Sequence, residues 1–294
     1  MYTAISSNKR KTVLLIAVFV AFIATMGYVF GLVYDSPGFL YFFGIGALLY
    51  ALVTYFMSAK IALGLSGAKE ISKDQAPELY RMVENLSITA GLPMPKVYVI
   101  NDPSPNAFAT GRDPKHAAVA VTTGLVERLE NEELEGVLAH EMAHIGNYDI
   151  RLMSVVTALV SIVSIISDFF LHFSIFGGDD DNPNPLMMVV AIVMALLAPL
   201  IAAVIQLAIS RRREYLADAT AVMLTRYPEG LAGALEKISH SKPMRKNSSA
   251  TAHLYIASPL GAAKGIGAKF AGLFSTHPPI DDRIQKIRDM GGQV

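Results

Sequence analysis

The sequence predicts an α-helical membrane protein with four transmembrane helices plus a cytosolic α+β domain, and three observations support this. Apolar residues make up 52% of the 294 residues and charged residues only 17%, which is little charge for a soluble protein. Four stretches are long and apolar enough to cross a bilayer, which takes about 20 residues each. The polar sequence around them shows helical and strand-like periodicity in turn.

The predicted spans form two hairpins. They cover Thr12–Tyr34, Gly38–Ala59, Leu152–Phe176 and Leu186–Ser210. The first span follows the basic run Lys9–Lys11 and so has the flank of a signal peptide. Its apolar run is longer than the roughly 7–15 residues of a signal core, and a second span follows almost at once. We therefore expect a retained membrane anchor.

The basic residues predict the orientation of the spans. The turns at 35–37 and 177–185 contain no lysine or arginine, whereas the other polar segments hold all of them. Short loops rich in lysine and arginine remain in the cytoplasm. We expect both chain ends and both large polar segments to be cytoplasmic.

The spans divide the chain into a hairpin at 1–60, a polar segment at 61–150, a second hairpin at 151–210 and a polar segment at 211–294. In the first polar segment, periodicity predicts a helix over Asp74–Ala90 and strands over Lys96–Ile100, Asn106–Thr110 and Ala117–Thr123. A further helix, capped by Asn131, follows these strands. In the second polar segment, helices are predicted over Arg211–Thr225, Gly230–His240 and Ile280–Met290.

Composition excludes several classes of function. The net charge is zero, so nothing in the overall balance indicates a nucleic-acid partner. The chain has no cysteine, which excludes thiolate metal ligands, disulfides and a cysteine nucleophile. A bound metal ion must therefore be held by nitrogen and oxygen atoms.

The most informative motif is His140-Glu141-Met142-Ala143-His144. Histidines four residues apart on a helix point from the same face, so both imidazoles can reach one metal ion. Glu141 then lies beside that metal, where it can take a proton from water as the general base. Nitrogen and oxygen ligands with an open position suit zinc best.

A catalytic zinc ion commonly takes three protein ligands and keeps one position for water. The candidates for the third ligand are Asp149, Glu214, Asp218, Glu229 and Glu236. Glu214 is favoured because the second hairpin leaves after His144 and returns before Glu214, which puts both motifs at a similar depth. Asp218 lies four residues further on the same helical face, where it can hydrogen-bond a ligand histidine and fix its tautomer. Asp149 would have to fold back across Gly146.

These motifs resemble those of the HtpX-type membrane zinc metalloproteases, bacterial heat-shock relatives of the CAAX prenyl proteases. The matching residues are His140–His144, the Glu214/Asp218 pair, Asn106–Gly111, Ser275–Pro279 and Arg283. The order of spans and motifs matches too, so the resemblance covers nearly the whole chain. It implies a zincin-like metalloprotease domain with one Zn²⁺ per chain, held by His140, His144 and Glu214.

The resemblance also implies roles for three residues that their spacing alone does not single out. Asn106, on an edge strand, would hold the substrate main chain, while His277 and Arg283 would lie near the metal and stabilise the oxyanion. The implied activity is endopeptidase cleavage of unfolded or damaged membrane proteins in stress-related quality control. The implied location is the bacterial cytoplasmic (inner) membrane, with the active site on the cytoplasmic side of the lipid bilayer. The oligomeric state is left open.

Three alternatives remain open from the sequence. An intramembrane protease would hold its metal inside a span, whereas here the charged run 130–135 precedes the motif. A metal-ion transporter would carry ligands within its spans, which in this chain are nearly free of ionisable groups. A catalytically silent membrane scaffold would bind metal without cleaving. A proteolysis assay with a Glu141 variant separates the transporter from the protease, which a metal titration alone would not.

The remaining polar residues are assigned structural roles. Asp168 and His172 lie toward the outer end of the third span, close enough to the interface to reach it. His116, His240 and His253 have no partner at ligand spacing and are predicted to lie at the surface. The stretch 241–272, rich in serine, lysine and glycine, is predicted to be either a lid or a plain linker.

Overall fold

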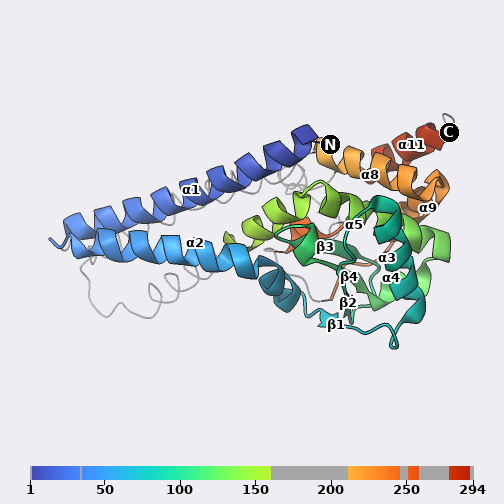
Figure 1. Ribbon diagram of the computed structural model, residues 1–294, viewed down its shortest axis with the longest axis horizontal. Coiled ribbons are helices and arrows are strands. Elements are labelled where there is room, and N and C mark those ends of the chain that lie inside the picture. The colour runs from blue at the N-terminus through green and yellow to red at the C-terminus, as the bar shows by residue number, and fades with distance from the viewer. Residues whose placement is uncertain (1, 34, 160–210, 246–250, 258–277, 292–294) are drawn as a thin grey trace, which may run out of the picture.

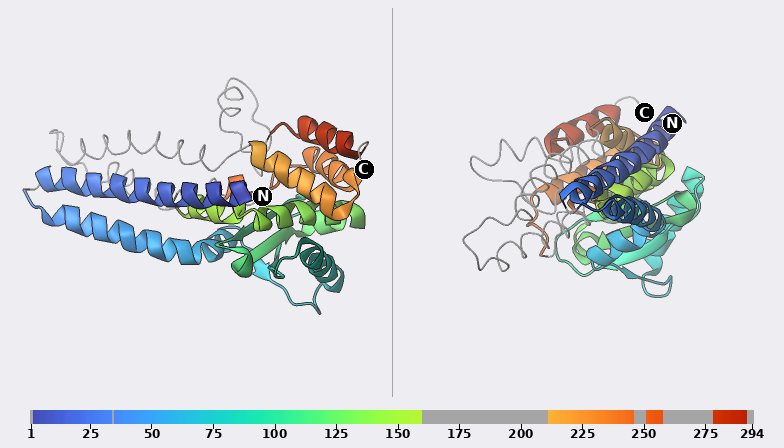
Figure 2. Two further views of the ribbon diagram at one scale, coloured as in Figure 1. Left: turned by 45° about the horizontal axis from the view of Figure 1, so that its top comes forward. Right: turned by 90° about the vertical axis from the view of Figure 1, so that its left-hand side faces the viewer.

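The computed structural model describes residues 2–33, 35–159, 211–245, 251–257 and 278–291. In this part of the chain, a helical hairpin projects from a body in which helices pack around a four-stranded sheet (Figure 1; Figure 2). Two helices of the described part are long and apolar enough to cross a membrane. Most of the predicted third and fourth spans lies outside the described residues, so the four-span topology stays a prediction.

The hairpin consists of α1 (Tyr2–Val33) and α2 (Gly38–Leu65), which lie side by side in both views (Figure 1; Figure 2). Their facing sides bury apolar residues such as Phe19, Phe30 and Ala47. Their outer sides expose large apolar residues, with Val13 69% and Phe42 76% exposed. A continuous apolar surface of this kind is costly in water and suits contact with lipid.

The sheet has the strand order β1-β2-β4-β3, with β1 (Lys69–Glu70), β2 (Lys96–Ile100), β3 (Ala107–Gly111) and β4 (Ala117–Thr122). β2 and β4 run parallel, whereas β1 and β3 are antiparallel to their neighbours. Every residue of β3 and β4 is buried, which suits their small and apolar side chains. β3 is an edge strand, as predicted for the segment after Asn106.

The helices of the body agree closely with the predicted ones, except that the short α4 was not expected. They are α3 (Pro77–Ala90), α4 (Thr123–Arg128), α5 (Asn131–Gly146), α8 (Arg211–Thr225), α9 (Pro228–Ser239) and α11 (Ile280–Gly291), with short 3-10 turns η1 (Pro114–His116) and η2 (Ala252–Leu254).

The prediction that Asn131 caps the histidine helix is wrong by one residue. Glu130 is the N-cap of α5 and forms a capping box with Glu133, in which each side chain binds the other residue's backbone N–H. Two carboxylates also complement the positive end of the helix dipole, which favours glutamate at the N-cap, and Asn131 is the first residue of the helix.

α5 is the central helix of the body and contacts α3, α8, α9 and β3. All its residues from Gly136 to Ile145 are buried. At Gly136 the helices pack backbone to backbone, since a Cβ there would lie 2.7 Å from the backbone nitrogen of Leu231 in α9. A helix enclosed on all sides has little freedom to move, so the histidine motif rests on a rigid support.

Candidate metal centre

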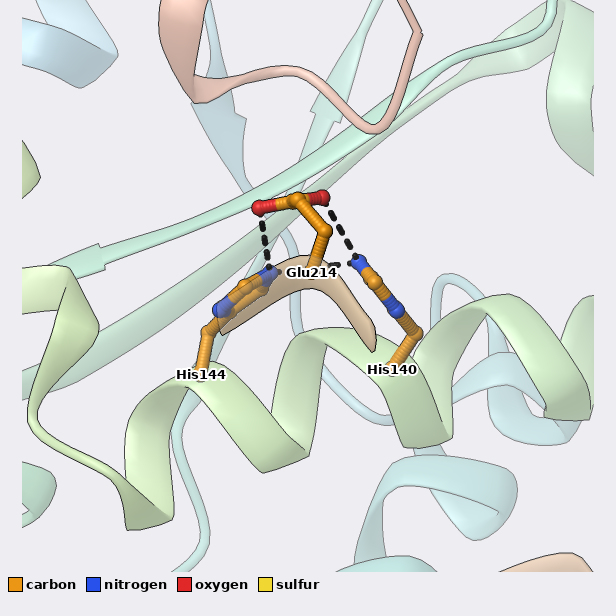
Figure 3. Close-up of side chains that lie close together, drawn as sticks. All are labelled: His140, His144 and Glu214. Carbon is orange, nitrogen blue, oxygen red and sulfur yellow. Dashed lines mark hydrogen bonds and ion pairs between the residues drawn. The ribbon is translucent and has the colours of Figure 1, made fainter. Parts of the chain in front are cut away.

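α5 presents His140 and His144 on one face, and both imidazoles are buried. Their Nε2 atoms lie 3.1 Å apart (Figure 3). The rings meet edge to face, with centroids 4.7 Å apart. The helical spacing of the motif therefore brings the two histidines together as the sequence indicates.

Glu214, in the first turn of α8, points its carboxylate at both histidines (Figure 3). Its Oε2 lies 3.8 Å from Nε2 of His140, and its Oε1 lies 3.7 Å from Nε2 of His144. The ligand atoms of the three residues all lie within 4.8 Å of one another, and the described residues offer no other cluster of this kind. Two segments separated by 70 residues of sequence thus converge on one point.

The three side chains fit a zinc ion. Zinc binds imidazole nitrogen and carboxylate oxygen at about 2.0–2.2 Å in a tetrahedral arrangement, which sets neighbouring ligand atoms about 3.3 Å apart. The separations of 3.1, 3.7 and 3.8 Å lie on either side of that value. Two imidazoles and one carboxylate also leave a fourth position for water, as catalytic zinc sites do.

Two aspartates contact the outer nitrogens of the histidines. Asp218 Oδ1 lies 3.0 Å from Nδ1 of His140, and Asp149 Oδ2 lies 3.0 Å from Nδ1 of His144. Each carboxylate favours a proton on Nδ1, which leaves the Nε2 lone pair directed at the centre. Asp218 therefore lies where the sequence predicted. Asp149, a candidate third ligand on sequence, faces the far side of His144 instead.

Arg283 is buried and held by Asp218 through two hydrogen bonds of 2.7 and 3.0 Å. Its guanidinium also lies 3.5 Å from His140 and 3.9 Å from Glu214. Burial opposes ionisation of Asp218, but the charge and hydrogen bonds of Arg283 and His140 hold the pKa of this carboxyl well below its usual range. Arg283 therefore lies beside the centre, as the resemblance implied, and is paired with its carboxylates.

Glu141 lies beside His140, faces the body and is 1% exposed. Burial raises the pKa of its carboxyl, while the nearby His140 and His144 act in the opposite direction. The backbone of Ala109 in β3 lies close to this carboxyl and also acts to lower its pKa. Glu141 is therefore held between the metal ligands and the edge strand.

The centre attracts positive charge even without a metal ion. Burial opposes the charged form of His144, but the hydrogen bond with Asp149 and the charges of Glu214 and Glu141 raise its pKa to about 9. The same surplus of carboxylates favours a divalent cation. A cation bound there would replace the proton on His144.

Asn106 precedes β3 and is buried. Its side-chain amide donates to the carbonyl of Ala257 at 3.0 Å, and its carbonyl accepts from the N–H of Ala257 at 3.4 Å. Beside it, the N–H of Ile256 donates to the carbonyl of Ala107. Asn106 is thus placed to hold an extended main chain, and here that chain is the protein's own segment 255–257.

Several predicted residues fall elsewhere. His277, Asp168 and His172 lie outside the described residues. Glu229 and Glu236 pair with Arg288 on the surface, away from the histidines. His253 is buried against the carbonyl of Met153, so its predicted place at the surface is wrong. It lies in a short segment whose burial depends on distant sequence, which the local pattern does not reveal.

Sequence reasoning missed two residues at the rim of the centre. Asn8 in α1 donates to Asp149 Oδ1 at 2.6 Å, and Arg213 lies 3.7 Å from the same oxygen. Arg213 lies within the predicted helix Arg211–Thr225, and its spacing gives it no relation to the motif. Asn8 lies in a polar stretch before the first span and has no spacing relation to the motif.

A buried histidine pair with a facing glutamate, an adjacent acid and an apolar helical hairpin together define a membrane metalloprotease. Residues 73–291 match the family model described as peptidase family M48. The chain belongs to this peptidase family.

Similar proteins agree with this assignment. The chain is 48% identical, over 100% of its own length and 99% of the relative, to a "Protease HtpX homolog" of Tropheryma whipplei strain Twist. It is 45% identical to a protein of that name from Listeria monocytogenes, over 99% of the chain and 100% of the relative. The fold is similar to the crystal structure of S. mikatae Ste24p, with a TM-score of 0.54 and 20% identity over 98% of this chain and 66% of that one. The predicted membership in the HtpX type of metalloprotease is therefore confirmed.

Proposed function

We propose that this metalloprotease is a zinc-dependent endopeptidase that cleaves unfolded or damaged membrane proteins at the cytoplasmic face of the bacterial inner membrane, in stress-related quality control. One observation supports the proposal most: the Nε2 atoms of His140 and His144 and the carboxylate of Glu214 converge beside buried Glu141. Among the described residues, this is the cluster with the donor set of a zinc hydrolase.

The chemistry follows from the groups around this cluster. A zinc ion held there would lower the pKa of a bound water to about 7 and polarise the scissile carbonyl. Glu141 accepts the proton of the water that attacks the carbonyl carbon, and its raised pKa suits a group that must both take and return a proton. It then gives that proton to the amine as the C–N bond breaks, so one water is consumed for each peptide bond cleaved.

Three further side chains would act on the substrate. Arg283 and His277 are proposed to stabilise the negative charge that develops on the carbonyl oxygen. Asn106 is proposed to hold the main chain of an extended substrate, which would replace its present contacts with Ala257. Recognition through the main chain tolerates many side chains, which suits unfolded substrates of varied sequence.

The location of the histidine motif favours this enzyme over a metal-ion transporter or an intramembrane protease. Asp35 is the single charged residue between Thr12 and Ala59, so the first two spans offer no ligands for a transported metal ion. The histidine motif lies instead on α5, which contacts the sheet of the body. This favours catalysis beside the membrane over catalysis within it.

The proposal is tested with two membrane test proteins that carry the same unfolded tail, one on the cytoplasmic side and one on the opposite side. Each is produced in bacterial cells with the wild-type enzyme or with Glu141→Gln. We expect shortening of the cytoplasmic tail by the wild type only. Cleavage of the tail on the opposite side, or equal cleavage by Glu141→Gln, would contradict the proposal.

A further inference from the structure

The first membrane helix reaches the metal centre through one buried amide. Asn8 of α1 is 2% exposed, and its side-chain Nδ2 donates two hydrogen bonds to the turn after α5. One runs 2.6 Å to Oδ1 of Asp149, and the other runs 3.1 Å to the carbonyl of Asn147. The start of α1 lies beside the body in both ribbon views (Figure 1; Figure 2).

The carboxylate of Asp149 connects this amide to a proposed zinc ligand. Oδ2 of Asp149 contacts Nδ1 of His144, while Oδ1 contacts Asn8. Arg213 approaches the same Oδ1 and also lies 3.5 Å from Oδ1 of Asn8. Since both oxygens of Asp149 have fixed partners, its plane and that of the His144 ring are fixed together.

Asn8 also supports the backbone that carries Asp149. The turn after α5 contains Tyr148 with φ of 60°, a left-handed conformation that is unfavourable for a bulky residue. Asn8 bonds to Asn147 and Asp149, the residues on both sides of Tyr148. The Nζ of Lys9 also lies 4.8 Å from the centre of the Tyr148 ring. The start of α1 therefore holds this turn in the conformation that directs Asp149 at His144.

Packing alone does not require an amide at this position. The next residues on the same face of α1 are Thr12 and Leu15, which are buried. Among the described residues, the Thr12 hydroxyl bonds to the carbonyl of Asn8 in its own helix and not to Asp149. A buried amide is costly unless it is hydrogen-bonded. Because Asn8 is a neutral donor, it orients the Asp149 carboxylate without neutralising the negative charge that acts on His144.

We infer that Asn8 is a positioning residue of the metal centre, acting through Asp149 on His144, so that the first membrane helix helps to set zinc affinity. This inference rests on the proposed zinc site. Loss of a group that orients a metal ligand typically weakens metal binding by about 10–100-fold. Since Asn8 acts at one remove from the ligand, we expect an effect near the lower end, about 10-fold.

The test measures zinc affinity of the full-length protein in detergent by chelator competition. The variants are Asn8→Leu, which keeps volume but removes the amide, Asp149→Asn, the double variant and Thr12→Val. Thr12→Val is the matched control, because it alters the same buried face of α1 without touching Asp149. We expect about 10-fold weaker binding in Asn8→Leu and wild-type affinity in Thr12→Val. The double variant should bind no more weakly than Asp149→Asn alone.

Wild-type affinity in Asn8→Leu, or a loss that adds fully to that of Asp149→Asn, would overturn the inference. Thermal unfolding of the zinc-free proteins checks that Asn8→Leu is folded, and Asn8→Ala replaces it if it is not. A different failure tests the proposed function itself: if His140→Ala binds zinc like the wild type, the proposed site is wrong whatever Asn8 does.

Discussion

At the scale of single residues, the carboxylates of the centre differ in the imidazole nitrogen that they face. Asp149 and Asp218 each face an Nδ1 atom, whereas Glu214 faces both Nε2 atoms. A carboxylate at Nδ1 orients the ring, and one at Nε2 can share a metal ion with it. Whether a carboxylate here is a metal ligand or orients a histidine is therefore decided by the imidazole nitrogen that it faces more than by its residue type.

Glu214→Gln is expected to weaken zinc binding more than about 100-fold, because a neutral amide replaces the anionic ligand. Glu236→Gln is the matched control, since Glu236 was a candidate ligand on sequence and pairs with Arg288 on the surface. Chelator competition measures both affinities. Tight zinc binding by Glu214→Gln would show that the third ligand lies elsewhere.

Zinc binding should strengthen with rising pH. In the metal-free protein, the pKa of His144 is raised to about 9, so below that pH a proton must leave before zinc can bind. The affinity should rise about 10-fold per pH unit from pH 7 and level off near pH 9. In Asp149→Asn, which lacks the carboxylate that raises this pKa, the plateau should begin at lower pH. A zinc affinity that does not change between pH 7 and pH 9 would show that His144 does not carry a proton that zinc must displace.

The positions of site residues were predictable from the sequence where local helix geometry determines them. A helix fixes the relation between His140 and His144, so their spacing was enough. Asp149 was harder to place, because its direction depends on the left-handed turn at Tyr148, which periodicity does not reveal. Asn8 was missed because its partner lies 141 positions away in the sequence.

At the scale of elements, Arg283 joins α11 to α8. Its two hydrogen bonds to Asp218 are buried, with both side chains at most 1% exposed. A buried pair of this kind is costly to break, because the remaining charge stays out of water. The pair also links the last helix of the body to the helix that carries Glu214.

Arg283→Met should lower the free energy of unfolding by about 3–5 kcal/mol, since it leaves Asp218 buried without its cation. Arg288→Met is the control on the same helix. Arg288 is 40% exposed in its pairs with Glu229 and Glu236, so its loss should cost less than about 1 kcal/mol. Denaturant unfolding in detergent compares the two variants, and equal losses would show that Arg283 contributes no more than a surface charge.

The helices and strands of the body were predictable because their apolar residues recur at regular intervals. Their arrangement was not, and the strand order β1-β2-β4-β3 does not follow from any local pattern. The same holds for the segment 255–257 against the edge strand β3, since its contacts with Asn106 join residues 151 positions apart.

At the scale of the whole molecule, the hairpin of α1 and α2 is both an apolar surface and a support for the body. The apolar part of this hairpin exposes large apolar side chains, and its polar start contacts the turn after α5. The sequence predicted the anchor from its length and hydropathy. It did not indicate that the start of α1 contacts Asp149, which in turn contacts His144.

The absence of native cysteine makes the orientation directly testable. Ser36→Cys lies in the turn between α1 and α2, and Lys115→Cys lies at an exposed position of the body. In intact cells, a membrane-impermeant thiol reagent should label Ser36→Cys, whereas Lys115→Cys should react only after the inner membrane is opened. The reverse pattern would place the active site on the outer side.

The central claim is that zinc on His140, His144 and Glu214, with Glu141 as the base, cleaves peptide bonds. The most direct measurement compares wild type and Glu141→Gln, each stripped of metal, reloaded with zinc and incubated with casein. We expect both to bind one zinc ion, and the wild type alone to cleave, with removal of the base slowing cleavage about 100–10,000-fold. Full cleavage by Glu141→Gln, or no cleavage by a wild type that holds its zinc, would contradict the account.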